Sequence, residues 1–168
     1  LPVIKIAELR SGVNAKSGRA AREIQDRYVV RDGDVLFSWS GSLLQKVWTG
    51  GEGALNQHLF KVTSTAVPKW FHFFAVDQHM EEFRAVAASK ATTMGHIQRH
   101  HLRDAKVVVP DSMLLSSLNA FVAPLFSRWI QAEIESDRLA VLRDQLLPKL
   151  MSGELRVRDA ERQVAEVV

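Results

Sequence analysis

Cysteine is absent from the 168 residues of this chain. Without thiols, the chain can form neither a disulfide framework nor a thiolate metal site, and we expect a reducing, cytoplasmic location. We find no signal peptide and no apolar run of the roughly 20 residues that a membrane-spanning helix needs, so we expect no membrane partner. The chain starts on Leu1 without a methionine, inside an expected strand, and we expect it to be part of a longer protein.

Excess charge is also small, since the formal net charge is only +3. With 46% hydrophobic and 24% charged residues, the composition is typical of a globular domain. Positive charge is nevertheless concentrated between residues 84 and 106, where Asp104 is the single acid. Such a patch can neutralise phosphates. Its basic members are Arg84, Lys90, His96, Arg99, His100, His101, Arg103 and Lys106.

Motifs for catalysis and nucleotide binding are missing as well. The run Gly50-Gly51-Glu52-Gly53 lacks the lysine and hydroxyl residue of a phosphate loop and precedes an expected strand, so we interpret it as a hairpin turn. There is no GxSxG, HExxH or Asn/Asp-Pro-Pro-aromatic motif. His96 and His100 have a metal-ligand spacing, but we interpret them as solvated. We expect a non-catalytic protein with no metal and no cofactor, while a triad assembled in space stays open.

The pattern predicts an α+β fold with a twisted, mostly antiparallel, β-rich domain, packed helices and a long projecting C-terminal helix. We expect a helix from Pro68 with one apolar face, a flexible stretch at 85–95 and an exposed loop at 10–22. The expected domains are 1–110, a helical region for pairing at 111–150 and a tail with a short strand at 151–168. Expected strands are 3–7, 28–30, 35–39, 43–48, 55–63, 102–110 and 154–158.

A helix with a seven-residue apolar repeat is expected at 111–150. Asp111 or Ser112 can cap it, Pro124 predicts a kink or break near Ala123, and Pro148 with Gly153 predicts its end. The repeat is typical of a helix that pairs with another helix, although the helix could instead fold back on its own core. The expected pairing residues are Leu118, Leu125, Ala132, Leu139, Leu142 and Leu146.

Polar side chains at the ends of expected strands are the candidates for contacting DNA. Their residue types bond phosphates and base edges, as glutamine does with adenine and arginine with guanine. The candidates are Ser38, Ser40, Ser42, Gln45, Lys46, Lys90, Thr92, Thr93, Gln98, Arg99, His100 and Arg103. The four tryptophans could stack on bases, but their apolar surroundings favour core packing: Trp39, Trp48, Trp70 and Trp129.

Four segments occur together in a recognisable order: GDVLFSWSGSL, GGEGALNQHLFKV, ATTMGHIQRHHL followed by VVVP, and LRDQLLPKLMSGELRV. Together they resemble the C-terminal half of the specificity (S) subunit of type I restriction-modification enzymes. The resemblance covers about Leu1 to Val157. It implies a recognition domain that reads one half of a split site in double-stranded DNA, followed by a spacer helix. Such subunits do no chemistry and position methyltransferase (M) subunits and, through them, restriction subunits.

The chain departs from the family in two ways. It has one recognition domain and one spacer helix, and the domain lacks the opening strand and helix of the family. It could be a fragment, a truncated frame or a half-size subunit that forms a homodimer and reads a palindromic split site. An alternative is a truncated half subunit that acts only in assembly through its long helix. A third hypothesis, an unrelated enzyme with a histidine-based site, ranks last.

Overall fold

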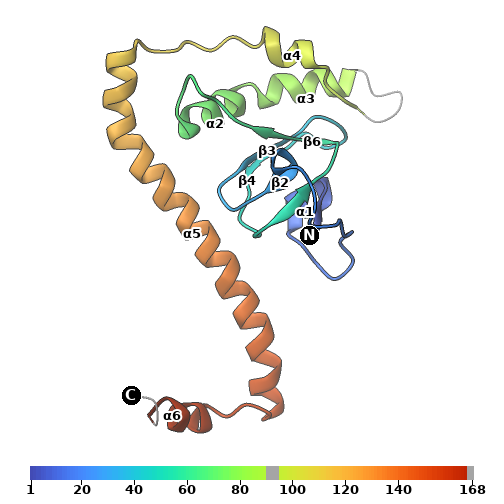
Figure 1. The fold of residues 1–168 in the computed structure, drawn as a ribbon, viewed down its shortest axis with the longest axis vertical. Helices are drawn as coiled ribbons and strands as arrows, with labels where there is room; N and C mark the ends of the chain where they lie inside the picture. Colours follow the sequence, from blue (N-terminus) through green and yellow to red (C-terminus); the bar gives the residue numbers. More distant parts are fainter. Residues whose placement is uncertain (90–94, 166–168) are drawn as a thin grey trace. The chain divides into compact units, whose positions relative to one another are not determined.

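The computed structural model describes residues 1–89 and 95–165 (Figure 1). The chain divides into two compact units, Leu1–Gln131 and Ala132–Val168. The first unit contains all the described strands and most of the helices, and the second contains the end of the long helix and a short helix after it. The expected α+β fold is confirmed.

Two three-stranded sheets form the centre of the first unit. In one sheet, with the order β1–β5–β2, β1 runs parallel and β2 antiparallel to β5. In the other, with the order β4–β3–β6, both neighbours of β3 are antiparallel to it. The strands are β1 (Val3–Ile4), β2 (Val29–Val30), β3 (Val35–Ser38), β4 (Gln45–Val47), β5 (Gly53–Leu55) and β6 (Leu59–Val62).

Strand β3 lies between two hydrophobic clusters, and all four of its residues are buried. Leu36 belongs to the cluster that contains Ile4 and Trp48, and Phe37 belongs to the cluster that contains Met80 and Phe83. Successive side chains of a strand point to opposite faces, so a strand covered on both faces is apolar throughout. This explains the run VLF and confirms the strand expected at 35–39.

The glycine turn after β4 is not a hairpin, which corrects the interpretation from sequence. β4 pairs with β3, whereas β5 pairs with β1 and β2, so residues 50–53 lead from one sheet to the other. A Cβ added to Gly53 would lie 2.5 Å from Cγ1 of Ile4. The close passage of β1 therefore requires glycine there. A glycine-rich turn has the same local sequence whether it closes a hairpin or connects two sheets. Only the pairing of distant strands distinguishes the two cases.

The helices of the chain include α1 beside the sheets and α2 to α4 in the second half of the first unit (Figure 1). The helix expected from Pro68 is confirmed, but it divides at His79 into two helices, and helical structure continues to Ser89 where a flexible stretch was expected from residue 85. Their bounds are α1 (Ile6–Ser11), the 3-10 helix η1 (Asp26–Tyr28), α2 (Lys69–Gln78), α3 (Met80–Ser89), α4 (Arg99–Asp104), α5 (Ser112–Ser152) and α6 (Val157–Ala165).

Two expected strands are absent from the described residues, and both predictions are wrong. Residues 102–110 hold the end of α4 and an irregular segment in which Val108 is 91% exposed. Residues 154–158 lead into α6. Valine favours a pleated, half-buried surface, but that preference becomes a strand only where a partner strand is available. None of the described strands pairs with either segment.

Helix α5 is continuous from Ser112 to Ser152, so the predicted break near Ala123 is wrong. Pro124 lies on an exposed side of the helix, and the helix continues on both sides of it although proline has no N–H to donate. The cap at Asp111 is confirmed, because its Oδ1 accepts a hydrogen bond from Leu114 N–H at 2.9 Å. The helix also passes Pro148 and ends just before Gly153, whose φ of +75° suits glycine.

The first part of α5 packs against α2, as the alternative of a helix folded on its own core predicted. Trp70 Nε1 donates a hydrogen bond to Asn119 Oδ1 at 2.9 Å. The ring of Phe73 lies 5.5 Å from that of Phe126 and 5.6 Å from that of Trp129, measured between ring centroids. These contacts lie within the first unit and fix this part of α5 on α2.

The seven-residue repeat of α5 lies on a different side from its buried residues. Leu125 is 71% exposed, whereas the neighbouring Phe126 is 7% exposed. Phe126, Ile130 and Ile134 recur every four residues and are buried. The expected pairing residues, which are those of the repeat and Leu142, are all exposed: Leu118, Leu125, Ala132, Leu139, Leu142 and Leu146.

By length and composition alone, α5 would pass as a membrane-spanning helix. This corrects the expectation that no stretch of the chain meets that criterion. A core helix passes the same test, so the finding is weak evidence for a membrane span.

Candidate nucleic-acid interface

An isolated antiparallel bridge between Ser40 and His96 joins two groups of candidate residues that are far apart in sequence. Gly41 N–H donates a hydrogen bond to Gly95 O at 2.8 Å, and Ile97 N–H donates to Trp39 O at 3.0 Å. The serine turn after β3 and the segment before α4 therefore form one surface. We call this surface, with α4, the α4 face.

Gly95 is the point at which this surface rests on α3. A Cβ added there would lie 2.7 Å from the carbonyl oxygen of Ala87 and 3.2 Å from its carbonyl carbon. Side chains larger than hydrogen do not fit against a backbone at that distance. The close approach positions the segment that leads into α4.

Two candidate serines hold the turn together. Ser38 is fully buried, its Oγ donates to Ser42 O at 2.6 Å, and the same Oγ accepts from Leu44 N–H at 2.8 Å. Ser40 is buried, and its Oγ lies 2.9 Å from His58 Nδ1. The burial of Ser38 contradicts a direct contact with DNA, and its role is to shape the turn. Ser42 is exposed at the turn itself.

Gln45 and Lys46 lie on β4, at the edge of the second sheet. Gln45 is half-buried, and its Nε2 donates to Phe73 O at 2.8 Å, which ties β4 to α2. Its Oε1 is buried without a hydrogen-bond partner among the described residues. Gln45 is thus occupied inside the protein, while the side chain of the half-buried Lys46 forms no hydrogen bond or ion pair with the described residues.

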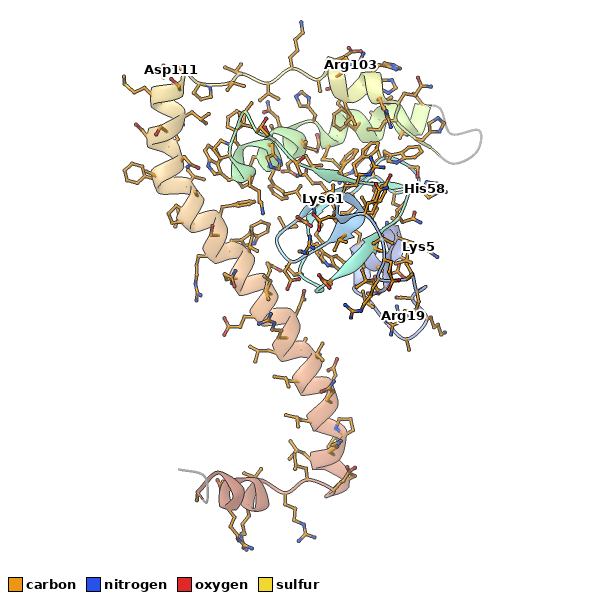
Figure 2. The ribbon with its side chains drawn as sticks, viewed as in Figure 1. Lys5, Arg19, His58, Lys61, Arg103 and Asp111 are labelled. Carbon is orange, nitrogen blue, oxygen red and sulfur yellow. The ribbon has the colours of Figure 1, made fainter. Side chains whose placement is uncertain are left out.

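Helix α4 carries the exposed charges of the face. Arg99 and Arg103 are exposed, and in residues 1–89 and 95–165 no carboxylate forms an ion pair with either guanidinium. Figure 2 labels Arg103 on this helix. Gln98 and His100 are exposed beside them. The remaining candidates lie outside the described residues: Lys90, Thr92 and Thr93.

A groove of about 360 Å³ runs between α4 and the end of β3. Trp39 forms part of its wall, with Nε1 donating to Gln57 O at 3.1 Å and its ring stacked on Phe60 with centroids 6.1 Å apart. The groove thus combines an apolar wall with amide and guanidinium groups. Its lining residues are Trp39, Gln57, Phe60, His96, Ile97, Gln98, Arg99 and Leu102.

Three of the four tryptophans pack against apolar residues, as expected from the sequence. Trp48 is 2% exposed and belongs to the first hydrophobic cluster. Trp70 and Trp129 pack between α2 and α5. Only Trp39 borders the groove, so it is the one tryptophan of the described chain that lies at the α4 face.

Three residues of this surface were not among the sequence candidates: Gln57 and Phe60 line the groove, and His58 Nδ1 lies 2.9 Å from Ser40 Oγ. They reach the face because β3 and β6 pair with Phe37 opposite Phe60. The motif GALNQHLFKV contains all three, but its alternating pattern gives no sign of which residues reach a surface. The described residues contain no group of three or more histidines and carboxylates arranged to hold a metal ion.

Ionisation shifts occur away from the α4 face. Burial and the nearby Lys69 lower the pKa of His72, whose Nδ1 is buried without a partner among the described residues. The hydrogen bond from Arg31, at 2.8 Å, lowers the pKa of the exposed Asp26. The neutral imidazole of His72 lines a largely apolar cavity of about 250 Å³ beside Phe37 and Phe83.

Comparison with known proteins gives one informative relative. No family model matches the chain, and no solved structure matches it significantly. The chain is 24% identical over 167 residues to a protein named type I restriction enzyme MjaIX specificity subunit, from Methanocaldococcus jannaschii. The match covers 95% of this chain and 38% of that protein. The chain thus spans well under half the length of this relative.

Proposed function

We propose that this chain is the DNA-recognition part of a type I restriction-modification specificity subunit. The observation that carries the proposal is the similarity to the Methanocaldococcus jannaschii specificity subunit, which extends over 95% of the chain. The four ordered motifs of the sequence favour the same family. The part of the first unit before α5 then corresponds to the recognition domain, and α5 to the spacer helix.

The α4 face is the part of the first unit best suited to double-stranded DNA. Arg99 and Arg103 are exposed and free of ion pairs with described carboxylates, so their charge is available to phosphates or guanine edges. Gln98 has the donor and acceptor pair that matches adenine in the major groove. Together they supply both the positioning and the reading that a sequence-specific contact requires.

In the complex, the chain reads one half of a split target and does no chemistry of its own. Methylation belongs to M subunits docked on the specificity subunit, and cleavage to restriction subunits that follow them. The chain itself needs no metal or cofactor and acts in the cytoplasm. Helix α5 sets the distance between the two half-sites by pairing with a second helix, either in another copy of the chain or in a further region.

Binding to a pool of duplexes with a randomised core tests the proposal. We expect enrichment of one short half-site and binding that weakens steeply with salt. R99Q/R103Q lowers the affinity about tenfold, because two charge-assisted contacts are lost. R156Q/R158Q removes the same charge from exposed positions of the second unit and leaves the affinity unchanged. No duplex binding at low salt refutes the proposed DNA recognition.

A second function, assembly without DNA binding, is favoured by one specific observation. The leucines of the α5 repeat are exposed, with Leu125 at 71% and Leu139 at 58%. An apolar row of this kind is buried when two helices pair. A stable dimer that binds no duplex at any salt concentration would select this function over DNA reading.

A further inference from the structure

A second concentration of positive charge lies at the start of the chain, outside the α4 face. Residues 1–22 contain a single acid, Glu8, which is buried and whose Oε2 accepts a hydrogen bond from Lys5 N–H at 3.1 Å. The basic residues of this segment are all exposed: Lys5, Arg10, Lys16, Arg19 and Arg22. The acid is turned inward and the cations face solvent.

The segment is held in a defined conformation. Val3 N–H donates to Gly18 O at 2.7 Å, Ala20 N–H donates to Leu1 O at 2.9 Å, and Pro2 pairs with Arg19 across an antiparallel bridge. These bonds join the loop to β1, which is itself paired with β5. Cations on an ordered backbone lose less conformational entropy on binding than cations on a free tail.

The loop is tied internally by a turn around Lys16. Asn14 N–H donates to Ser17 Oγ at 3.0 Å, and Lys16 N–H donates to Asn14 Oδ1 at 2.8 Å. This pair of bonds is typical of asparagine and serine turns. The turn holds the backbone of Lys16 while its side chain stays exposed.

Lys5 and Arg19 lie close together on this frame. The Nζ of Lys5 is 3.8 Å from the position that a Cβ on Gly18 would take, and Arg19 is the next residue. Figure 2 shows both at the same edge of the domain. Like charges at one edge of the domain favour an anionic ligand, because an anion offsets their mutual repulsion.

Most of these cations are not neutralised by the protein. Arg22 forms an ion pair with Glu52 at 3.7 Å. The described part of the chain supplies no carboxylate within ion-pair distance of the other four: Lys5, Arg10, Lys16 and Arg19. We call these four residues the N-terminal basic surface.

Helix α1, which contains Arg10 of the N-terminal basic surface, contacts the serine turn of the α4 face. Ile6 Cδ1, on α1, lies 3.7 Å from the position of a Cβ on Gly41. Gly41 in turn donates its N–H to Gly95 O at 2.8 Å, in the segment that leads into α4. Contacts within the first unit thus link α1 to the serine turn, and the serine turn to the segment that leads into α4.

We infer that the N-terminal basic surface binds backbone phosphates of the same duplex whose bases the α4 face reads. The inference rests on the proposed function and adds to it a second, sequence-independent contact. Its residues are lysines and arginines without the amide side chains or aromatic groove of the α4 face. Point charges of this kind attract phosphates and carry no information about the base sequence.

The test measures duplex binding by fluorescence anisotropy between roughly 50 and 200 mM salt, a range over which counterion release changes the affinity strongly. The variant R10Q/K16Q/R19Q removes three cations from the surface. R138Q/R156Q/R158Q is the matched control, with the same change of charge at exposed positions on α5 and beyond it. R99Q/R103Q reports on the α4 face. Each variant is measured on a duplex selected for binding and on an unrelated duplex.

We expect R10Q/K16Q/R19Q to bind both duplexes about tenfold more weakly at the higher salt, with a salt slope shallower by about 2.7 for three lost phosphate contacts. R99Q/R103Q is expected to reduce the preference for the selected duplex, which the N-terminal variant retains. Thermal melting monitored by circular dichroism shows whether each variant is folded.

Two results overturn the inference while leaving the proposed function intact. In one, R10Q/K16Q/R19Q binds like the unchanged chain although R99Q/R103Q does not. In the other, the matched control weakens binding as much as the N-terminal variant does, so that net charge alone explains the loss. A different result, absence of duplex binding by the unchanged chain, refutes the proposed function and the inference together.

Discussion

The Oγ of Ser40 lies 2.9 Å from Nδ1 of His58, although the two residues are 18 positions apart. Ser40 follows β3 and His58 precedes β6, so this bond closes the end of the paired strands. The bridge from Ser40 to His96 starts from the same residue. One serine thus connects the sheet to the segment that carries α4.

Replacing Ser40 tests the value of that connection. We expect S40A to lower the free energy of unfolding by about 1 kcal/mol, because His58 loses its buried partner. Urea unfolding measures the change. S42A, at an exposed position of the same turn, should stay within about 0.5 kcal/mol of the unchanged chain. Equal effects of the two substitutions would show that the bond is not the stabilising element.

Gly95 is expected to tolerate no side chain. In G95A the new methyl group would meet the Ala87 backbone at 2.7 Å, so the segment must move away from α3. We expect a loss of about 1–3 kcal/mol in unfolding free energy and weaker duplex binding, since the α4 face shifts. G18A is the control, because its nearest neighbours would lie 3.8 Å away and its φ is not positive. A G95A variant as stable as G18A contradicts the close packing.

His72 should make stability depend on pH. Its pKa in the folded chain is lowered from the ordinary value of 6.5 by burial and by Lys69, so the unfolded state takes up a proton more readily. Stability contributed by the neutral ring is therefore present above the unfolded pKa and is lost as pH falls below it towards the folded pKa.

We expect H72F to flatten the dependence of unfolding free energy on pH just below neutrality. Denaturant unfolding over a pH series measures this, with H100Q as the control at an exposed histidine. If H72F and the unchanged chain keep parallel profiles, His72 is not the group responsible.

The exposed repeat of α5 predicts self-association. We expect the chain to form dimers and L125E/L139E to be monomeric, because a charge in a helix-pairing row must be desolvated. Light scattering over a concentration series measures the mass. S127E/Q145E adds the same charge to exposed positions on the other side of the helix and should remain dimeric. A monomeric unchanged chain would mean that the row awaits a different partner.

Pro124 should weaken the helix that it occupies. A proline inside a helix removes one hydrogen bond and crowds the preceding turn, so P124A is expected to raise the unfolding free energy by up to about 3 kcal/mol. Urea unfolding provides the measurement. P68A, at the N-cap of α2 where no such bond is lost, should be nearly neutral. No gain in P124A would indicate that the helix already adjusts around the proline.

The local patterns of the sequence were sufficient for several elements. The run VLFS predicted β3, the periodic apolar residues after Pro68 predicted helix, and Asp111 predicted the cap of α5. In each case the signal depends on residues within one or two turns of one another. The exposed charges Arg99 and Arg103 were also found this way, because charge and solvent exposure go together.

Long-range pairing was decided only by the tertiary structure. The glycine turn at 50–53 leads between two sheets, the valines at 107–109 find no partner strand among the described residues, and Ser38 is buried where exposure was expected. The bridge from Ser40 to His96 makes one face of two segments that the chain keeps far apart. Sequence periodicity shows which side of a segment is apolar, but which surface covers that side depends on contacts with distant residues. For this reason the sequence alone determined the elements and their charges, and the fold decided which of them meet.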